Sequence, residues 1–232
     1  MIKKKYSVLG ILPARSGSKG LKNKNIKILN NKPLFFYAAK ALVDSKLIDK
    51  KICSTDSIKI AKLAKEYGLE IDNLRPKYLA TDKAIIVDVL NYELKKMASK
   101  NEFYDYIVLV QPTSPTITTN LINKAVKLAI SRKLDNVITG YYCNMQHPST
   151  FYTFDKKKNF QWLIKDKNRK ARRQDMKKYF IRTGLLYVIK SQLIYNKNFY
   201  GKKIGHIEIK KENSITIDDK YDFLQAKKIF EK

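Results

Sequence analysis

Short apolar runs alternate with amphipathic stretches along most of the chain. The runs from Ser7 to Leu12, Lys51 to Thr55 and Tyr106 to Val110 have the length and composition of buried strands. Between them, apolar residues recur every three or four positions, which places them on one face of a helix. The same pattern predicts strands at Asn136 to Tyr142, Leu185 to Ile189 and Lys203 to Ile209, and helices at Pro33 to Val43, Asp56 or Ser57 to Tyr67, Ile85 to Met97, Thr118 to Arg132 and Tyr221 to Phe230. Such alternation predicts an α/β domain with a mostly parallel sheet and flanking helices.

The pattern breaks between about residues 141 and 184, where aromatic side chains stand among polar ones and no long helix is indicated. The aromatic residues of this stretch are Phe151, Tyr152, Phe154, Phe160 and Trp162. They would be poorly covered in a single copy of the chain, and exposed apolar patches commonly mark interfaces. We therefore expect one domain over residues 1–232, with residues 141–184 as a small inserted dimerisation arm.

The composition narrows the classes of partner. A net charge of +27 together with 44% hydrophobic residues favours a folded domain over a basic disordered tail. Excess positive charge attracts nucleic acids, anionic membranes or phosphate ligands. Only seven of the 48 basic residues are Arg, however, and Arg is the side chain best suited to reading base edges. A nucleic-acid-binding protein is thus the distant alternative.

Cysteine and histidine are scarce. The two cysteines, Cys53 and Cys143, and the two histidines, His147 and His206, are too few and too scattered for a disulfide framework or a zinc site. The apolar stretch near the N-terminus ends at Pro13, which is too early for a signal peptide core or a membrane span. We expect a reduced, cytoplasmic protein with no membrane partner.

The loop after the first strand carries the clearest chemistry. In open α/β sheets, ligands bind outside the carboxyl ends of the strands. Here that position holds glycines, a hydroxyl and three cations, namely Gly17, Gly20, Ser18, Arg15, Lys19 and Lys24. The order of residues is neither a Walker A loop nor a GxGxxG turn. Cations interleaved with small residues still suit a polyphosphate.

This loop, ILPARSGSKGLKNKNI, resembles the opening signature of the acylneuraminate cytidylyltransferase (CMP-sialic acid synthetase) family, IPARxGSKGxxxKNI, which includes legionaminic acid-type enzymes. Five further motifs stand in the family's order: STD at residues 54–56, RPKYLATD at 75–82, QPTSP at 111–115, RQD at 173–175 and IDDKYD at 217–222. The match runs from residue 8 to about residue 224. It implies a Rossmann-like nucleotide-diphospho-sugar transferase fold.

The resemblance also implies a reaction. In this family, CMP passes from CTP to the anomeric hydroxyl of a nine-carbon α-keto acid sugar, and pyrophosphate is released. N-acetylneuraminic and legionaminic acids are the expected substrate types, with 3-deoxy-octulosonic or pseudaminic acid as alternatives. The pair Lys24-Asn25 after GSKG favours the nine-carbon branch.

The resemblance assigns roles to individual residues. Catalytic cations that hold the triphosphate would be Arg15, Lys19 and Lys24. Nucleotide contacts would come from Ala14, Ser18, Asn25, Arg75, Thr81 and Asp82. Sugar contacts would come from Gln111, Tyr187 and Arg173, the last pairing with the sugar carboxylate across a dimer interface. Arg172 is an equal candidate for that pairing, while Gln111 in a turn and Tyr187 in the core are the structural alternatives.

CTP chemistry implies Mg²⁺, and the family binds it through two acids. Asp218 matches the second acid and has a catalytic and metal-binding role by resemblance, but Thr216 stands in place of the first. Asp218 would act alone with phosphates and water, or Asp219 or Asp222 would compensate. Asp222 has the alternative role of complementing the last helix N-terminus. A catalytically impaired scaffold is the third possibility.

Overall fold

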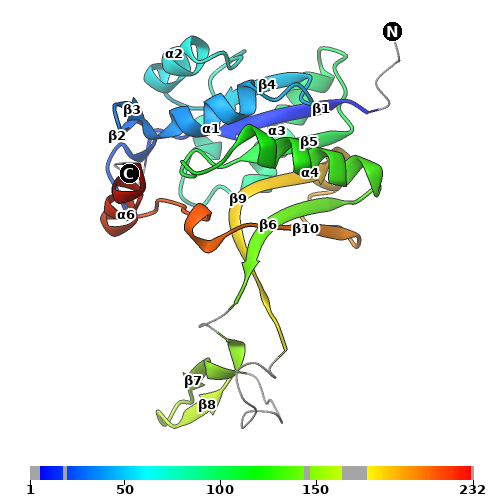
Figure 1. Ribbon diagram of the computed structural model, residues 1–232. Helices are drawn as coiled ribbons and strands as arrows, with labels where there is room; N and C mark the ends of the chain where they lie inside the picture. Colours follow the sequence, from blue (N-terminus) through cyan, green and yellow to red (C-terminus); the bar gives the residue numbers. More distant parts are fainter. Residues whose placement is uncertain (1–5, 18–19, 144–146, 164–176, 231–232) are drawn as a thin grey trace.

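The computed structural model describes residues 6–17, 20–143, 147–163 and 177–230. Its centre is a six-stranded sheet in the order β10-β6-β9-β5-β1-β4 (Figure 1). These strands are β1 (Val8–Pro13), β4 (Lys50–Ser54), β5 (Tyr106–Val110), β6 (Asn136–Tyr142), β9 (Phe180–Lys190) and β10 (Ile204–Glu208). All run parallel except β9, which is antiparallel to both of its neighbours. The predicted mostly parallel sheet is confirmed.

Helices cover both faces of the sheet and form two separate cores. One core includes α1 (Leu34–Val43), α2 (Ile58–Glu66) and α4 (Thr119–Ser131), and the other includes α3 (Ile86–Ala98) and α5 (Ser191–Tyr195). The long helices begin and end within two residues of the predicted bounds. Ser57 is the N-cap of α2, since its Oγ accepts the Ile60 N–H at 3.3 Å.

A third, smaller core lies beside the sheet. There α6 (Lys220–Phe230) packs against β2 (Ile28–Leu29), and the buried contacts come from Leu29 of β2, Leu34 of α1 and Phe223 of α6. The strand β3 (Lys32–Pro33) pairs with β2. Short 3₁₀ turns complete the structure: η1 (Lys24–Ile26), η2 (Lys77–Leu79), η3 (Pro148–Thr150) and η5 (Lys211–Asn213). This packing fixes the segment before α6 next to the loop that follows β1.

The predicted insertion forms an arm. Figure 1 shows β6 and β9 leaving the sheet together as a twisted ribbon, with the hairpin of β7 (Tyr152–Phe154) and β8 (Phe160–Trp162) at its far end. The pairing of β6 with β9 is irregular between Ile138 and Gly140. β9 begins five residues before the predicted strand, because the arm is an extension of the sheet rather than a separate loop.

The parallel strands bring three loops to one edge. Pro13 at the end of β1 pairs with Ser54 at the end of β4, and β5 lies on the other side of β1. The segments after Pro13, Ser54 and Val110 therefore meet at the carboxyl edge of the sheet, where α/β proteins bind their ligands.

None of the helices in the described part of the chain has the length and apolar character needed to cross a bilayer.

Candidate functional site

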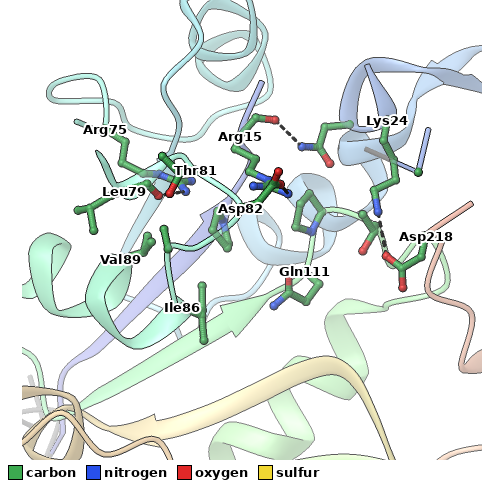
Figure 2. A pocket seen from close by; sticks show the side chains of 16 residues that line it. Arg15, Lys24, Arg75, Leu79, Thr81, Asp82, Ile86, Val89, Gln111 and Asp218 are labelled. Atoms are coloured by element: carbon green, nitrogen blue, oxygen red, sulfur yellow. Dashed lines mark hydrogen bonds and ion pairs between the residues drawn. The ribbon is translucent and has the colours of Figure 1, made fainter. Parts of the chain in front are cut away.

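A cavity of about 520 Å³ opens at this carboxyl edge. It is bounded by the loop after β1, the segment around η2, the start of α3, the turn after β5 and the residue Asp218 before α6 (Figure 2). Eight residues predicted from the sequence line it: Arg15, Lys24, Asn25, Arg75, Thr81, Asp82, Gln111 and Asp218. Motifs up to about 200 residues apart in sequence thus form one site.

Arg15 occupies the middle of the cavity (Figure 2). Its Nη2 lies 2.7 Å from Oδ1 of Asp82, and both side chains are partly exposed. This ion pair joins the loop after β1 to the segment that precedes α3. An anionic ligand entering here would meet the Arg15 guanidinium directly.

The loop that carries Arg15 is anchored by Asp56 of the STD motif. The Asp56 carboxylate accepts the Ser16 N–H at 2.8 Å and the Ser16 hydroxyl at 2.5 Å. From the other side, Asn25 Nδ2 donates to the Arg15 carbonyl at 2.9 Å. Asn25 Oδ1 is buried and has no hydrogen-bond partner among the described residues. A buried acceptor without a partner on a cavity wall indicates a place for a donor group of a ligand.

Lys24 and Asp218 form the opposite side of the cavity. Lys24 Nζ lies 2.8 Å from Asp218 Oδ1, and the lysine side chain is 14% exposed whereas the aspartate side chain is 75% exposed. Lys24 is the first residue of η1, the 3₁₀ turn that follows the loop. The exposed carboxylate of Asp218 remains open to solvent and to a ligand.

Two neighbouring acids hold Asp218 in place. Asp222 Oδ2 accepts the N–H groups of Asp218 and Asp219 at 2.9 and 3.2 Å, and Asp219 Oδ1 accepts the Asp222 N–H at 2.9 Å. This reciprocal arrangement is a capping box at the start of α6. The prediction that Asp222 stabilises the last helix is confirmed. Thr216 Oγ1 donates to the Thr183 carbonyl at 3.5 Å.

Arg75 is the most deeply buried cation of the site, with 6% of its surface exposed. Its Nε donates to Ser54 Oγ at 3.1 Å, its Nη2 to the Ser54 carbonyl and its Nη1 to the Leu79 carbonyl at 3.3 Å. Burial lowers the pKa of the guanidinium from its ordinary value, and the carboxylates of Asp56 and Glu93 oppose that shift. Arginine stays protonated despite such shifts.

Apolar residues beside Arg75 complete that end of the cavity. Leu79, Ile86 and Val89 lie next to Arg75 and Thr81 in Figure 2. None of the three is predicted from the sequence, because Ile86 and Val89 have the spacing of ordinary residues of α3 and Leu79 is an apolar residue of the short turn η2. Position within the RPKYLATD motif is the signal that would have identified Leu79.

The structure places the other predicted residues elsewhere. The Ala14 side chain is fully buried in the core, and its N–H donates to the Ser54 carbonyl at 2.9 Å. Tyr187 is also buried and packs on Phe199 with ring centroids 4.9 Å apart, so it does not line the cavity. Ser18, Lys19, Arg172 and Arg173 lie outside the described residues.

Gln111 takes part in the turn after β5 and also lines the cavity. Its N–H donates to the Leu185 carbonyl at 3.2 Å, and its own carbonyl accepts the Ser114 N–H at 3.2 Å. These bonds fix the turn after β5, while the residue lines the cavity. Both bonds come from backbone groups of Gln111, whereas the structural alternative predicted for this residue involves its side-chain amide.

The fold and the cavity define an α/β protein with a cavity at the carboxyl ends of its strands, lined by the cations Arg15, Lys24 and Arg75. Comparison with known proteins narrows this class. The family model described as cytidylyltransferase matches residues 9–232, and the chain belongs to this family.

Relatives with assigned names agree with the family. The chain is 31% identical to an N-acylneuraminate cytidylyltransferase of Escherichia coli, over 93% of this chain and 50% of the relative. It is 30% identical to a CMP-N,N'-diacetyllegionaminic acid synthase of Legionella pneumophila, over 97% of this chain and 96% of the relative. The chain spans about half the length of the N-acylneuraminate cytidylyltransferases that it matches.

Solved structures confirm the fold. The structure of a CMP:2-keto-3-deoxy-manno-octonic acid synthetase complexed with CTP matches with a TM-score of 0.70, over 97% of this chain and 98% of the other. The two sequences are 13% identical, so this likeness concerns the fold. It confirms the predicted Rossmann-like nucleotidyltransferase architecture.

Proposed function

We propose that this chain transfers CMP from CTP to the anomeric hydroxyl of a nine-carbon α-keto acid sugar of the N-acetylneuraminic or legionaminic acid type. The observation that carries the proposal is the gathering of Arg15, Lys24, Arg75 and Asp218 around one cavity in a member of the cytidylyltransferase family. The names of the relatives from E. coli and L. pneumophila support the nine-carbon sugar acids as substrates.

The proposed transfer exchanges one bond to phosphorus for another. The anomeric oxygen of the sugar forms a bond to the α-phosphorus of CTP, the bond from that phosphorus to the bridging oxygen of pyrophosphate breaks, and the hydroxyl proton is released. Negative charge grows on the leaving pyrophosphate. Arg15 and Lys24 both line the cavity and would stabilise that charge. Positioning with electrostatic stabilisation accounts for most of the catalysis of such transfers.

The two ends of the cavity suit the two ends of the nucleotide. The Arg75 end combines hydrogen-bond donors with the apolar side chains of Leu79, Ile86 and Val89, which suits a flat base. The Lys24 end is polar and includes Gln111 and Asp218, which suits phosphates and sugar hydroxyls. By the family resemblance, Ser18 and Lys19 of the same loop would contact the nucleotide and its phosphates.

The exposed carboxylate of Asp218 is of the kind that binds Mg²⁺. This ion is commonly bound by one or two carboxylates with substrate phosphates and waters, and it neutralises phosphate charge during transfer. No cluster of three or more His, Cys, Asp or Glu side chains occurs within the described ranges, so phosphate and water would supply the remaining ligands. Asp222 is occupied by the helix cap, so Asp218 is the residue that would hold the ion.

A second copy of the chain is the proposed partner of the arm. Tyr152, Phe154, Phe160 and Trp162 share one face of the β7–β8 hairpin, and each is more than 40% exposed. An apolar face of this kind needs cover. In the proposed homodimer, Arg173 or Arg172 from one arm would reach the sugar carboxylate in the other subunit. Light scattering tests the homodimer.

The variant Phe154→Ser/Trp162→Ser should be a monomer at concentrations where the parent is a dimer. Phe103→Ser is the matched control, because Phe103 is 67% exposed but lies outside the arm. A monomeric parent, or a dimeric arm variant, would contradict this part of the proposal.

We propose the cytoplasm as the location of the reaction. The free thiols Cys53 and Cys143 suit that reducing compartment.

Pyrophosphate release tests the proposed transfer. Purified chain with CTP and Mg²⁺ is given N-acetylneuraminic, legionaminic, pseudaminic and 3-deoxy-octulosonic acids in separate reactions. We expect release with at least one nine-carbon acid and formation of the matching CMP-sugar. Folded protein that releases pyrophosphate with none of them would refute the proposal, and turnover with any of them would exclude the impaired scaffold.

A matched pair of lysines tests the site. Lys24 lines the cavity, whereas Lys22, two residues earlier in the same loop, is exposed and does not line it. Lys24→Ala should lower kcat by about 100-fold or more, on the order of the loss of one preorganised transition-state donor. Lys22→Ala should leave kcat within about twofold. Equal effects would remove Lys24 from the mechanism.

A further inference from the structure

A buried carboxylate lies directly behind the cavity without lining it. Glu93 of α3 is 1% exposed in its side chain. Its Oε1 accepts the Ser54 hydroxyl at 2.6 Å, and its Oε2 lies 2.5 Å from Lys96 Nζ. A charged residue is rarely buried to this extent unless its partners hold it there. The proposed transfer gives Glu93 no direct part.

Ser54 joins Glu93 to Arg75. The serine hydroxyl has one hydrogen, and it is donated to the Glu93 carboxylate. The same oxygen accepts the Arg75 Nε–H at 3.1 Å, and the Ser54 carbonyl accepts from Arg75 Nη2. Because Glu93 takes the hydroxyl hydrogen, the lone pairs of Ser54 Oγ are turned toward the guanidinium.

The remaining donors of Arg75 are then fixed in direction. A guanidinium has five N–H donors in a rigid planar fork. Three of them are used by Ser54 Oγ, the Ser54 carbonyl and the Leu79 carbonyl. One N–H on each terminal nitrogen is left, and Arg75 lines the cavity.

We infer that Glu93 is a positioning residue that acts through Ser54. It holds the Arg75 fork so that the two remaining N–H groups are presented together to the base of the nucleotide. Two neighbouring donors match a ring carbonyl next to an unprotonated ring nitrogen, which cytosine offers and uracil does not. This inference rests on the proposed function, since it names the part of that site that selects the base.

The first experiment measures CTP and UTP binding by calorimetry in the presence of Mg²⁺. Glu93→Gln and Ser54→Ala should each weaken CTP binding by roughly tenfold, the scale for losing a hydrogen bond to a charged group, and should narrow the preference for CTP over UTP. Neither change should further weaken binding when combined with Arg75→Ala. Wild-type affinity and selectivity in Glu93→Gln, or effects that add fully to Arg75→Ala, would overturn the inference.

The second experiment needs no nucleotide. With seven arginines in the chain, the Nε–H signals in a ¹⁵N–¹H NMR spectrum are few, and Arg75→Lys identifies the one from Arg75. That signal should be protected from solvent exchange in the wild type and lose its protection in Glu93→Gln and Ser54→Ala. Rapid exchange in the wild type, or unchanged protection in both variants, would overturn the inference.

A control variant and the wild type distinguish a failure of the proposed function from a failure of the role inferred for Glu93. Glu102→Gln removes another carboxylate that pairs with a lysine, Lys50, at the opposite edge of the sheet. It should change neither the Arg75 signal nor CTP binding. A wild type with a protected Arg75 signal that does not bind CTP would count against the proposed function, while the role of Glu93 in holding Arg75 would stand.

Discussion

Substituting Gly20 by alanine should slow the proposed transfer without unfolding the protein. Gly20 lies in the loop after β1, beside the backbone of Asp218 at the start of α6. A Cβ added at Gly20 would overlap the Asp218 carbonyl oxygen, which is main chain and cannot rotate away. The loop with Arg15 and Lys24 and the segment with Asp218 would therefore have to move apart.

The size of the displacement sets the size of the effect. Relieving the overlap requires a shift of roughly 0.6–1 Å between the two sides of the cavity. A misplacement of about 1 Å in a reacting geometry costs about 100-fold in rate, so we expect Gly20→Ala to lower kcat by roughly 10- to 100-fold. Overpacking of this kind costs about 1–3 kcal/mol in stability.

Gly17 in the same loop provides the control. A Cβ at Gly17 meets no atom within 4 Å. Gly17→Ala should therefore retain the parent's kcat and melting temperature, as followed by pyrophosphate release and thermal unfolding. The reasoning is refuted if Gly20→Ala matches the parent in kcat, or if Gly17→Ala loses as much activity as Gly20→Ala does.

Two further variants test the surroundings of the site. Asp222→Ala removes the acceptor for the N–H groups of Asp218 and Asp219. It should lower the free energy of unfolding by about 1 kcal/mol and should also lower kcat. A loss of stability with unchanged kcat would show that the cap does not position Asp218. Asp135 accepts the Lys203 N–H, and this bond, with the Lys190 ammonium, lowers the pKa of the carboxyl. The stabilisation is present above the unfolded pKa of about 3.9 and is lost as the pH falls through the lower folded pKa. Asp135→Asn should thus be less stable than the parent at neutral pH by about 1 kcal/mol, with the gap closing in acid unfolding below about pH 4. A gap that does not depend on pH would contradict this assignment.

Much of the fold follows from local pattern. Tyr106 to Val110 is apolar at every position and forms a strand buried on both faces, as its composition predicts. Gly68 ends α2 with a φ of 84°, which the sequence indicated from glycine after an amphipathic stretch. The sequence indicates Arg15 and Lys24 because cations interleaved with glycine and serine follow the first strand. Arg75 is indicated only by its place in the RPKYLATD motif that resembles the family's.

The remainder depends on distant contacts that no local pattern encodes. Glu93 has the spacing of an ordinary helix residue, and only the fold shows that it meets Ser54 across the cavity wall. The sequence allows Tyr187 to be either a binding residue or a core residue, and only the structure shows that it is buried with its ring against Phe199. The five-residue helix α5 was missed because one turn is too short to show a period.

The pairing of β6 and β9 on both sides of their irregularity has a mechanical consequence for the arm. Sliding one strand along the other would break every hydrogen bond of their ladder at once, so the length by which the arm projects is fixed. Bending at the irregularity between Ile138 and Gly140 breaks none of the paired positions on either side. A tilt of the hairpin about this position would therefore leave unchanged how far the arm extends from the sheet.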